Sequence, residues 1–184
     1  YYFCPYPDFH VLWEDYRVFN SLGAWGYINL CNPHTPSPEF GDLRNYLSAK
    51  LIEEPQMTKA EYENHIIEFM QAFYGAGWQE IKAYFDLIHR LSAGEGKCFS
   101  VYSSPEVIFG EHAFAPYNDE LVGWFDRAEE GAETETQRIH VRRLRISMDY
   151  LRLGAIHQRE MTSGDEGRVN AMIREVKAFH KRCF

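Results

Sequence analysis

Two pairs of adjacent carboxylates are the residues in this chain that most resemble an acid–base pair. They are Glu14-Asp15 and Glu53-Glu54. Two carboxyl groups that act across one bond must stand about 5–10 Å apart, on opposite sides of it. Neighbours on a helix instead point apart into water. We therefore assign a catalytic role to neither pair.

Thiols and imidazoles are present, but without the spacing of a metal site. The four cysteines include no Cys-x-x-Cys pair, and the eight histidines include no His-x-x-x-His pair. Structural zinc sites draw their ligands from such pairs, so we expect no metal and no other cofactor. A disulfide is left open, because the sequence does not give the connectivity. The cysteines are Cys4, Cys31, Cys98 and Cys183.

The composition is that of a folded, acidic domain. Of the 184 residues, 45% are apolar and 16% are aromatic, which is enough to fill a core and would also suit a platform for sugar stacking. A formal net charge of −8 disfavours nucleic acid as a partner, because phosphate binding needs a basic face. No apolar run is long enough to cross a membrane. The chain starts at Tyr1 without a methionine, and we read it as a piece of a longer protein.

The elements of the first third alternate between helix and strand signals. Apolar residues at helical spacing run from a capping residue, Asp8, to Gly23. The short apolar run 24–30, between a glycine and an Asn-Pro pair, predicts a buried parallel strand. A proline-rich loop over 32–39 then leads into a helix over 40–54. This order is typical of a β/α unit.

The remainder of the chain is predicted to be helical. A Thr-x-x-Glu capping box begins a helix at Thr58, and a second helix over 78–91 follows after a tight turn. Residues 94–118 form a long connection whose aromatic side chains act as packing anchors or as a lid over a glycan. Three further helices follow. Apolar residues at helical spacing, such as Leu47, Met70 and Ile81, give the helices over 40–54, 58–74 and 78–91 one side each that we expect to be buried, and the final helix has Met172, Ile173 and Val176 on one side.

Arginines gather on the long central helix of this last part, and glutamates precede it. We expect the two groups to neutralise each other on a solvated face, rather than to form a basic stripe for an acidic glycan. The arginines are Arg138, Arg142, Arg143, Arg145 and Arg152, and the glutamates are Glu129, Glu130, Glu133 and Glu135.

Three stretches of the sequence resemble a known family. They look like the C-terminal half of a family of large bacterial proteins of unknown function, related to the α-glucuronidase and α-N-acetylglucosaminidase type glycoside hydrolases. The resemblance covers roughly residues 6–90 and implies a (β/α)8 barrel followed by a helical C-terminal region. The stretches are Tyr6-Pro-Asp-Phe9 with Trp13-Glu-Asp-Tyr-Arg17 and Gly23-Ala-Trp-Gly26, Phe40-Gly-Asp-Leu-Arg-Asn-Tyr-Leu-Ser-Ala-Lys-Leu51, and Glu68-Phe-Met-Gln-Ala-Phe-Tyr-Gly75 with Ile81-Lys-Ala-Tyr-Phe-Asp-Leu87.

The resemblance makes the predicted strand 24–30 the last strand of a barrel, whose site lies at the carboxyl ends of its strands. Four residues would then contact carbohydrate hydroxyls at the rim. In the alternative interpretation, the two asparagines cap turns, the histidine is simply exposed, and the glutamate favours the start of the next helix through its dipole. The four residues are Asn29, Asn32, His34 and Glu39. The resemblance supplies no catalytic residue for this chain.

We expect a mainly α protein in two parts. Residues 1–56 would form the terminal β/α unit of a (β/α)8 barrel, and residues 57–184 a helical bundle as a C-terminal domain. The expected function is that of the C-terminal region of a glycoside-hydrolase-like protein. Its helices would buttress the barrel and add rim contacts to a carbohydrate, without catalysis by this chain alone. The alternative is a self-contained helical protein-interaction module with no carbohydrate role.

The expected partners follow from these two hypotheses. They are a carbohydrate, the N-terminal barrel of the parent chain and a second copy in a homodimer formed through an exposed apolar patch. Neither nucleic acid nor a membrane is expected. The resemblance implies a periplasmic or extracellular location.

Overall fold

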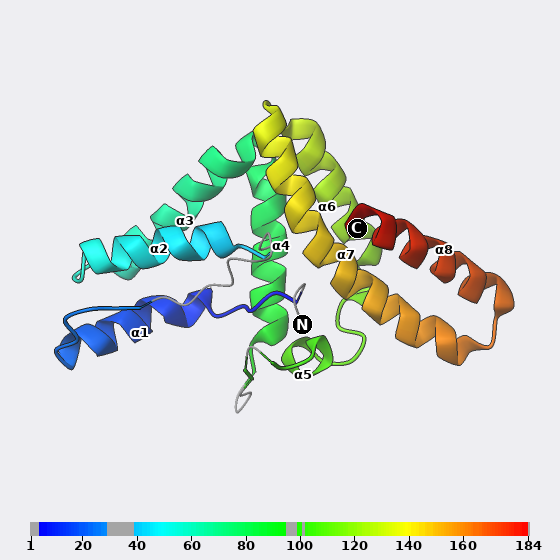
Figure 1. The fold of residues 1–184 in the computed structure, drawn as a ribbon, viewed down its shortest axis with the longest axis horizontal. Helices are drawn as coiled ribbons and strands as arrows, with labels where there is room; N and C mark the ends of the chain where they lie inside the picture. The colour runs from blue at the N-terminus through cyan, green and yellow to red at the C-terminus, as the bar shows by residue number, and fades with distance from the viewer. Residues whose placement is uncertain (1–3, 29–38, 95–98, 101, 184) are drawn as a thin grey trace.

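The computed structural model describes residues 4–28, 39–94, 99–100 and 102–183. Over these residues the protein is mainly α-helical and contains no strand, which confirms the predicted fold class at that level (Figure 1). The α-helices are α1 (Phe9–Ser21), α2 (Gly41–Glu53), α3 (Lys59–Tyr74), α4 (Trp78–Ser92), α5 (Pro105–Phe109), α6 (Asn118–Gly131), α7 (Glu135–Ser163) and α8 (Glu166–Cys183). Short 3-10 turns lie at η1 (Gly75–Gly77) and η2 (Ala115–Tyr117).

The strand predicted over 24–30 is wrong in the part that the structure describes. Residues 24–28 form neither strand nor helix, and the side chains of Trp25 and Ile28 are 99% and 89% exposed. Tyr27 turns back onto α1, where its ring stacks on Tyr16 with centroids 4.9 Å apart and its hydroxyl donates to Asn20. Over 24–28 the apolar run is therefore a largely exposed segment that Tyr27 attaches to α1.

Capping determines where two of the long helices begin. Thr58 Oγ1 accepts a hydrogen bond from the Glu61 amide at 3.3 Å, and the Glu61 carboxylate accepts one from the Thr58 amide at 2.8 Å. Thr134 and Gln137 form the same reciprocal pair at the start of α7. Each pair satisfies amides that have no partner inside the helix. The predicted start at Thr58 is confirmed.

The helix α4 stands at the centre of the fold, with α1–α3 on one side and α6–α8 on the other (Figure 1). It packs on α3, α5 and α6. Tyr84 of α4 meets Phe125 of α6 edge to face, with ring centroids 5.3 Å apart. The apolar faces predicted for α2, α3 and α4 are confirmed in the core, to which they contribute Leu43, Leu47, Leu51, Tyr62, Ile66, Met70, Ile81, Tyr84, Phe85 and Ile88.

The helix α6 lies directly against the turn between α3 and α4. A Cβ atom added at Gly77 would stand 2.6 Å from the backbone of Ala128, and one added at Gly131 would stand 3.1 Å from the Gly77 nitrogen. A side chain at Gly77 would thus collide with backbone atoms, which cannot rotate away. The close approach of the two backbones requires glycine at position 77.

The long connection predicted over 94–118 contains α5 and η2, and three of its aromatic residues are packing anchors. Phe109 and Phe114 are buried and meet edge to face with centroids 5.0 Å apart. Phe99 contacts the ring of Tyr6 at 5.5 Å. These contacts support the anchor interpretation for these three residues.

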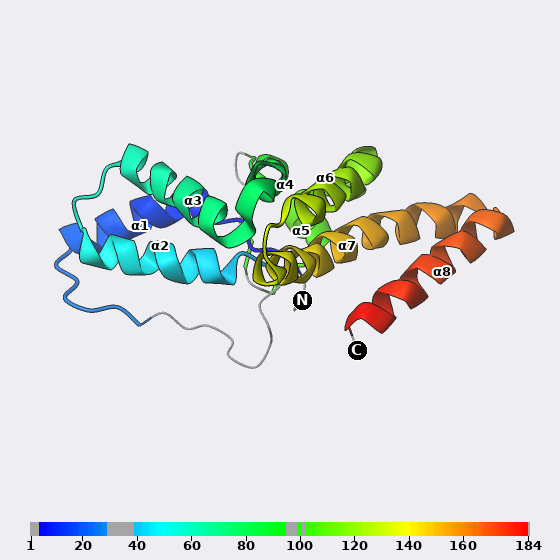
Figure 2. The ribbon, with the colours of Figure 1, turned by 90° about the horizontal axis from the view of Figure 1, so that it is seen from above.

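The last two helices form a hairpin that extends away from the body of the molecule (Figure 2). The helix α8 packs along α7. Its predicted apolar side is only partly covered, since Met172 is buried whereas Ile173 and Val176 are each 38% exposed.

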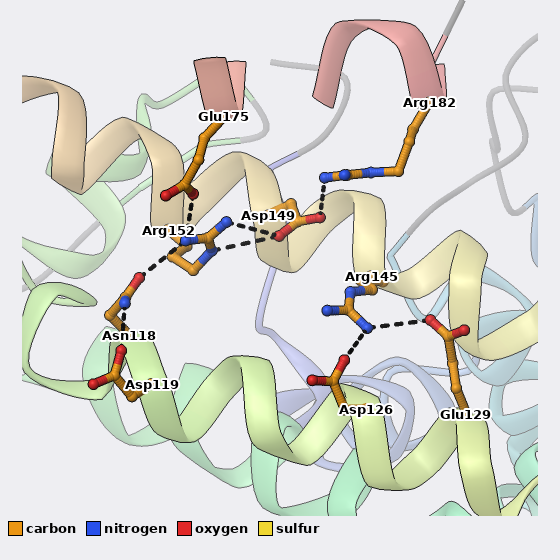
Figure 3. A network of polar contacts seen from close by, with 9 residues as sticks. All are labelled: Asn118, Asp119, Asp126, Glu129, Arg145, Asp149, Arg152, Glu175 and Arg182. Atoms are coloured by element: carbon orange, nitrogen blue, oxygen red, sulfur yellow. Dashed lines mark hydrogen bonds and ion pairs between the residues drawn. The ribbon is translucent and has the colours of Figure 1, made fainter. Parts of the chain in front are cut away.

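A buried carboxylate fastens α8 to α7 (Figure 3). The side chain of Asp149 is 4% exposed and accepts hydrogen bonds from Arg152 of its own helix at 3.4 Å and from Arg182 of α8 at 2.7 Å. Arg152 also pairs with Glu175 of α8 at 3.0 Å and donates to Asn118 of α6 at 3.1 Å. The network links three helices.

The arginines of α7 also pair with acids of α6, as the sequence predicts. Arg145 contacts Asp126 at 2.6 Å and Glu129 at 3.2 Å, and Arg142 contacts Glu129 at 3.0 Å (Figure 3 shows the Arg145 pairs). Asp126 and Arg142 are each more than half exposed, and ion pairs of such exposed groups contribute little stability each.

Candidate functional site

One of the four predicted carbohydrate contacts can be placed. Asn29, Asn32 and His34 lie outside the described residues. Glu39 stands just before α2, where it is partly buried and its carboxylate accepts a hydrogen bond from the backbone amide of Tyr6. It is thus engaged with the N-terminal segment of the chain.

An ion pair lies beside Glu39. Arg44 of α2 pairs with Asp8, donates to the carbonyl of Tyr6 at 2.8 Å and places its guanidinium 4.5 Å from the ring centroid of Phe9. Asp8 is the N-cap residue of α1, as predicted, but its side chain makes no hydrogen bond to the start of the helix. The competing partner is Arg44, which lies 36 residues away in the sequence.

The Glu39 carboxyl is the group of this cluster that could exchange a proton near neutral pH. Burial, reinforced by the charge of Asp8, raises its pKa to about 7, against the opposing influence of Arg44 and the Tyr6 amide. Burial, with the charge of Glu39, also raises the pKa of the Cys4 thiol to about 12. The thiol therefore stays protonated and is a poor nucleophile. The second carboxylate of the cluster, that of Asp8, is paired with Arg44, so Glu39 is the one acid–base group that the cluster offers.

His89 of α4 is a second enclosed polar group, which sequence reasoning missed. Its Nδ1 donates to the Phe85 carbonyl at 2.7 Å, and its ring packs against Phe9 and His10, each with centroids 5.7 Å away. Burial lowers its pKa to about 4, so the imidazole is neutral. Its Nε2 is buried and has no hydrogen-bond partner among the described residues. Across the described part of the chain, no three His, Cys, Asp or Glu side chains gather as metal ligands.

The end of α1 and the segment after it expose several large apolar side chains. Five side chains at the end of α1 and in the segment after it are exposed, and we call them the α1 apolar surface. They are Val18 (53% exposed), Phe19 (47%), Leu22 (78%), Trp25 (99%) and Ile28 (89%).

The side of α1 opposite the α1 apolar surface packs against the rest of the fold. The opposite side of α1 is anchored by the buried rings of Phe9 and Tyr16, and Trp13 Nε1 donates to the Met57 carbonyl at 2.8 Å. The stacking of Tyr27 on Tyr16 fixes the segment that carries Trp25. The exposed residues therefore sit on an ordered scaffold.

Acidic residues of α1 precede this surface. Glu14 and Asp15 are both exposed on the same helix. Partial burial and the charges of Asp8 and Glu14 raise the pKa of Asp15. The helix that carries the apolar surface thus also carries two exposed acids, together with one exposed base, Arg17.

No family model, curated protein or solved structure matches this chain. None of the described helices is long and apolar enough to cross a membrane. The resemblance to glycosidase-related proteins therefore stays a prediction.

Sequence reasoning missed the exposure of Trp25 and Ile28. A short apolar run bounded by turn residues is compatible with a buried strand and with an exposed segment alike. What distinguishes the two cases in this chain is the contact of Tyr27 with Tyr16 and Asn20. No local sequence pattern predicts that contact.

Proposed function

We propose that this chain is a helical docking module, whose α1 apolar surface packs against another folded protein surface. The observation that supports this function is the exposure of Leu22, Trp25 and Ile28 within one short part of the chain that is anchored to α1 through Tyr27. Large exposed apolar side chains gathered in one short part of a chain are typical of interaction sites. Trp in particular is enriched among the residues that contribute most to binding.

Two versions of this function differ in which molecule supplies the surface against which the α1 apolar surface packs. If it belongs to the same polypeptide, the helices buttress a neighbouring domain, which is the arrangement implied by the glycosidase resemblance. If it belongs to another chain, the protein is an interaction module. The barrel itself and carbohydrate contacts by Asn29, Asn32, His34 and Glu39 stay predictions within the first version.

The chemistry of the surface defines its partner. Trp25, Leu22 and Ile28 require an apolar patch with a pocket for an indole ring. The acidic pair Glu14-Asp15 favours basic side chains at the border of that patch, because such charges would relieve the mutual repulsion of the two acids. The occupant is thus a folded polypeptide with an apolar patch and a basic rim.

Site-specific photo-crosslinking in the native cell tests this function. A photoreactive phenylalanine analogue replaces Trp25, and the crosslinked peptides are mapped by mass spectrometry. We expect crosslinks to converge on one protein surface and to disappear when Ile28→Asp is added. The map also tells the two versions apart, since it identifies the surface as part of the same polypeptide, of a second copy or of another protein.

The matched control carries the same analogue at Tyr102, which is 85% exposed and lies far from α1 in the sequence. Random collisions would give the two positions the same scattered crosslinks. That result, or crosslinks at position 25 that persist with Ile28→Asp, would rule out docking through this surface.

A further inference from the structure

The helix α8 is a basic element of an acidic chain. It contains five lysines and arginines and two glutamates, whereas the whole chain has a formal net charge of −8. Glu175 of α8 pairs with Arg152 of α7 at 3.0 Å. Arg182 of α8 pairs with Asp149 of α7 at 2.7 Å. The side of α8 that carries Glu175 and Arg182 therefore faces α7.

The opposite side of α8 combines exposed cations with apolar side chains. Lys177 follows Glu175 by two positions, which turns it about 200° around the helix axis, away from α7. Ile173 and Lys181 lie one turn before and one turn after Lys177, so they share its side. Ile173 and Val176 are each 38% exposed, and the three cations are exposed as well. We call this side the α8 basic surface, and its residues are Ile173, Arg174, Val176, Lys177 and Lys181.

The cations of the α8 basic surface have no acidic partner in the described part of the chain. The ion pairs that α8 makes there use Arg168, Glu175 and Arg182, and they leave out Arg174, Lys177 and Lys181. Charges that the fold does not use can attract a surface of opposite charge. The chemistry of the α8 basic surface thus fits a partner that exposes acids beside apolar side chains.

The α1 apolar surface has this composition. Glu14 and Asp15 are both exposed, and they lie about one turn before Val18, on the same side of α1. Val18 and Leu22 are 53% and 78% exposed. The α1 apolar surface in turn fits an apolar patch with a basic rim, and the α8 basic surface offers both parts. The two surfaces are therefore complementary in charge and in apolar character.

The contact between them has to form between two molecules. The helices α1 and α8 lie toward opposite ends of the long axis of the molecule (Figures 1 and 2), so α8 does not cover α1 of its own chain. We propose that the α1 apolar surface of one copy docks on the α8 basic surface of a second copy. This inference rests on the proposed docking function and names its partner. Two copies side by side in opposite directions make the contact twice, which gives the homodimer expected from the sequence.

Charge reversal on each surface, followed by sedimentation equilibrium of the whole chain, tests this contact. Glu14→Lys with Asp15→Lys reverses the acids of α1, and Lys177→Glu with Lys181→Glu reverses two cations of α8. We expect each double variant to raise the Kd of self-association at least about tenfold, because like charges then meet. The chain with all four changes pairs opposite charges again, and its Kd should return to within about threefold of the wild-type value.

The α1 variant separates docking from the general repulsion between two acidic molecules. It makes the chain less acidic, so general repulsion alone would strengthen its association, whereas docking predicts weaker association. The chain with all four changes has the wild-type net charge. Lys59→Glu, at an exposed cation of α3, is the control and should change the Kd less than about twofold. Circular dichroism checks that each variant stays helical.

Stronger association of the α1 variant would overturn the inference, and so would a chain with all four changes that associates no better than the double variants. A wild-type chain that stays monomeric at high concentration would overturn it too. The crosslinks from position 25 then decide about the docking function itself. Convergence on a surface outside a second copy would keep that function with a different partner, whereas scattered crosslinks would reject both proposals.

Discussion

Glu39 holds its proton more tightly in the folded chain than in the unfolded one. Its pKa rises from an ordinary value of 4.5 to about 7, chiefly through burial. Between these two pH values the unfolded chain loses the proton first, so the folded state binds more protons and stability falls as the pH rises. Above about pH 7 both states are ionised and this contribution is lost.

Glu39→Gln should therefore flatten the pH dependence of the free energy of unfolding between pH 4.5 and 7. The wild-type chain loses at most about 3 kcal/mol across this range through Glu39, and the variant should lose that much less. Urea unfolding at half-unit pH steps measures it. Glu120→Gln, at an exposed acid of α6, is the control and should keep the wild-type slope. Identical slopes in wild type and Glu39→Gln would contradict the account of Glu39.

At the scale of single residues, the sequence predicted which side chains are buried far better than it predicted polar partners. Leu47 and Met70 were correctly placed by helical spacing, which is a local property. The ion pair of Asp8 was not predicted, because its partner Arg44 is distant in the sequence. His89 gave no signal, since it packs against Phe9 and His10 of another helix, α1.

At the scale of helices, α8 depends on one buried carboxylate. Replacing Asp149 by Asn leaves Arg152, only 11% exposed, with a weaker partner, and it removes the acceptor of Arg182. We expect a loss of about 3 kcal/mol and faster amide exchange throughout α8, while α3 and α4 keep their protection. Hydrogen exchange read by mass spectrometry gives this pattern directly.

The comparison variant is Asp86→Asn, which breaks the exposed pair with Lys82 on α4. A pair of that kind contributes less than about 0.5 kcal/mol, so exchange in α8 should not change. Wild-type protection of α8 in Asp149→Asn would show that the apolar contacts of α8 hold it without the network.

The contact of α6 with the η1 turn predicts a sharp difference between two glycines. Gly77→Ala pushes a methyl group against the Ala128 backbone and should destabilise the fold by about 2–3 kcal/mol. Gly154→Ala meets open space inside α7 and should stabilise it by about 0.5–1 kcal/mol. Chemical denaturation of the two variants side by side measures both. Similar free energies of unfolding for the two variants would show that α6 does not lie against η1 as described.

The start of a helix was predictable where a local sequence motif defines it, as the capping box does at Thr58. The five-residue α5 was missed, because one turn and a half is too short to show a helical period. The prediction of a strand over 24–30 was wrong for a related reason. Its apolar character is real, but whether such a run is buried depends on what covers it, and over 24–28 the described part of the chain leaves Trp25 and Ile28 uncovered.

At the scale of the whole molecule, the α1 apolar surface should matter for association and not for folding. Leu22→Ser combined with Ile28→Ser changes exposed positions, so the free energy of unfolding should move by less than about 0.5 kcal/mol. On its own, the wild-type chain should form the predicted homodimer through this surface. Sedimentation at high concentration should find the double variant monomeric. A wild-type chain that is equally monomeric would contradict the homodimer.

The measurement that tests docking most directly is the oxidation rate of Trp25 under hydroxyl-radical footprinting. It is compared between the isolated chain and the protein in its native cell, with Tyr102 as the internal reference, because the side chains of Trp25 and Tyr102 are both exposed in the structure. If a partner covers the surface, Trp25 should react fast in the isolated chain, diluted until it is monomeric, and much more slowly in the cell, while Tyr102 should react alike in both. Equal rates for Trp25 in the two settings would mean that nothing covers the α1 apolar surface, and the proposed function would be wrong.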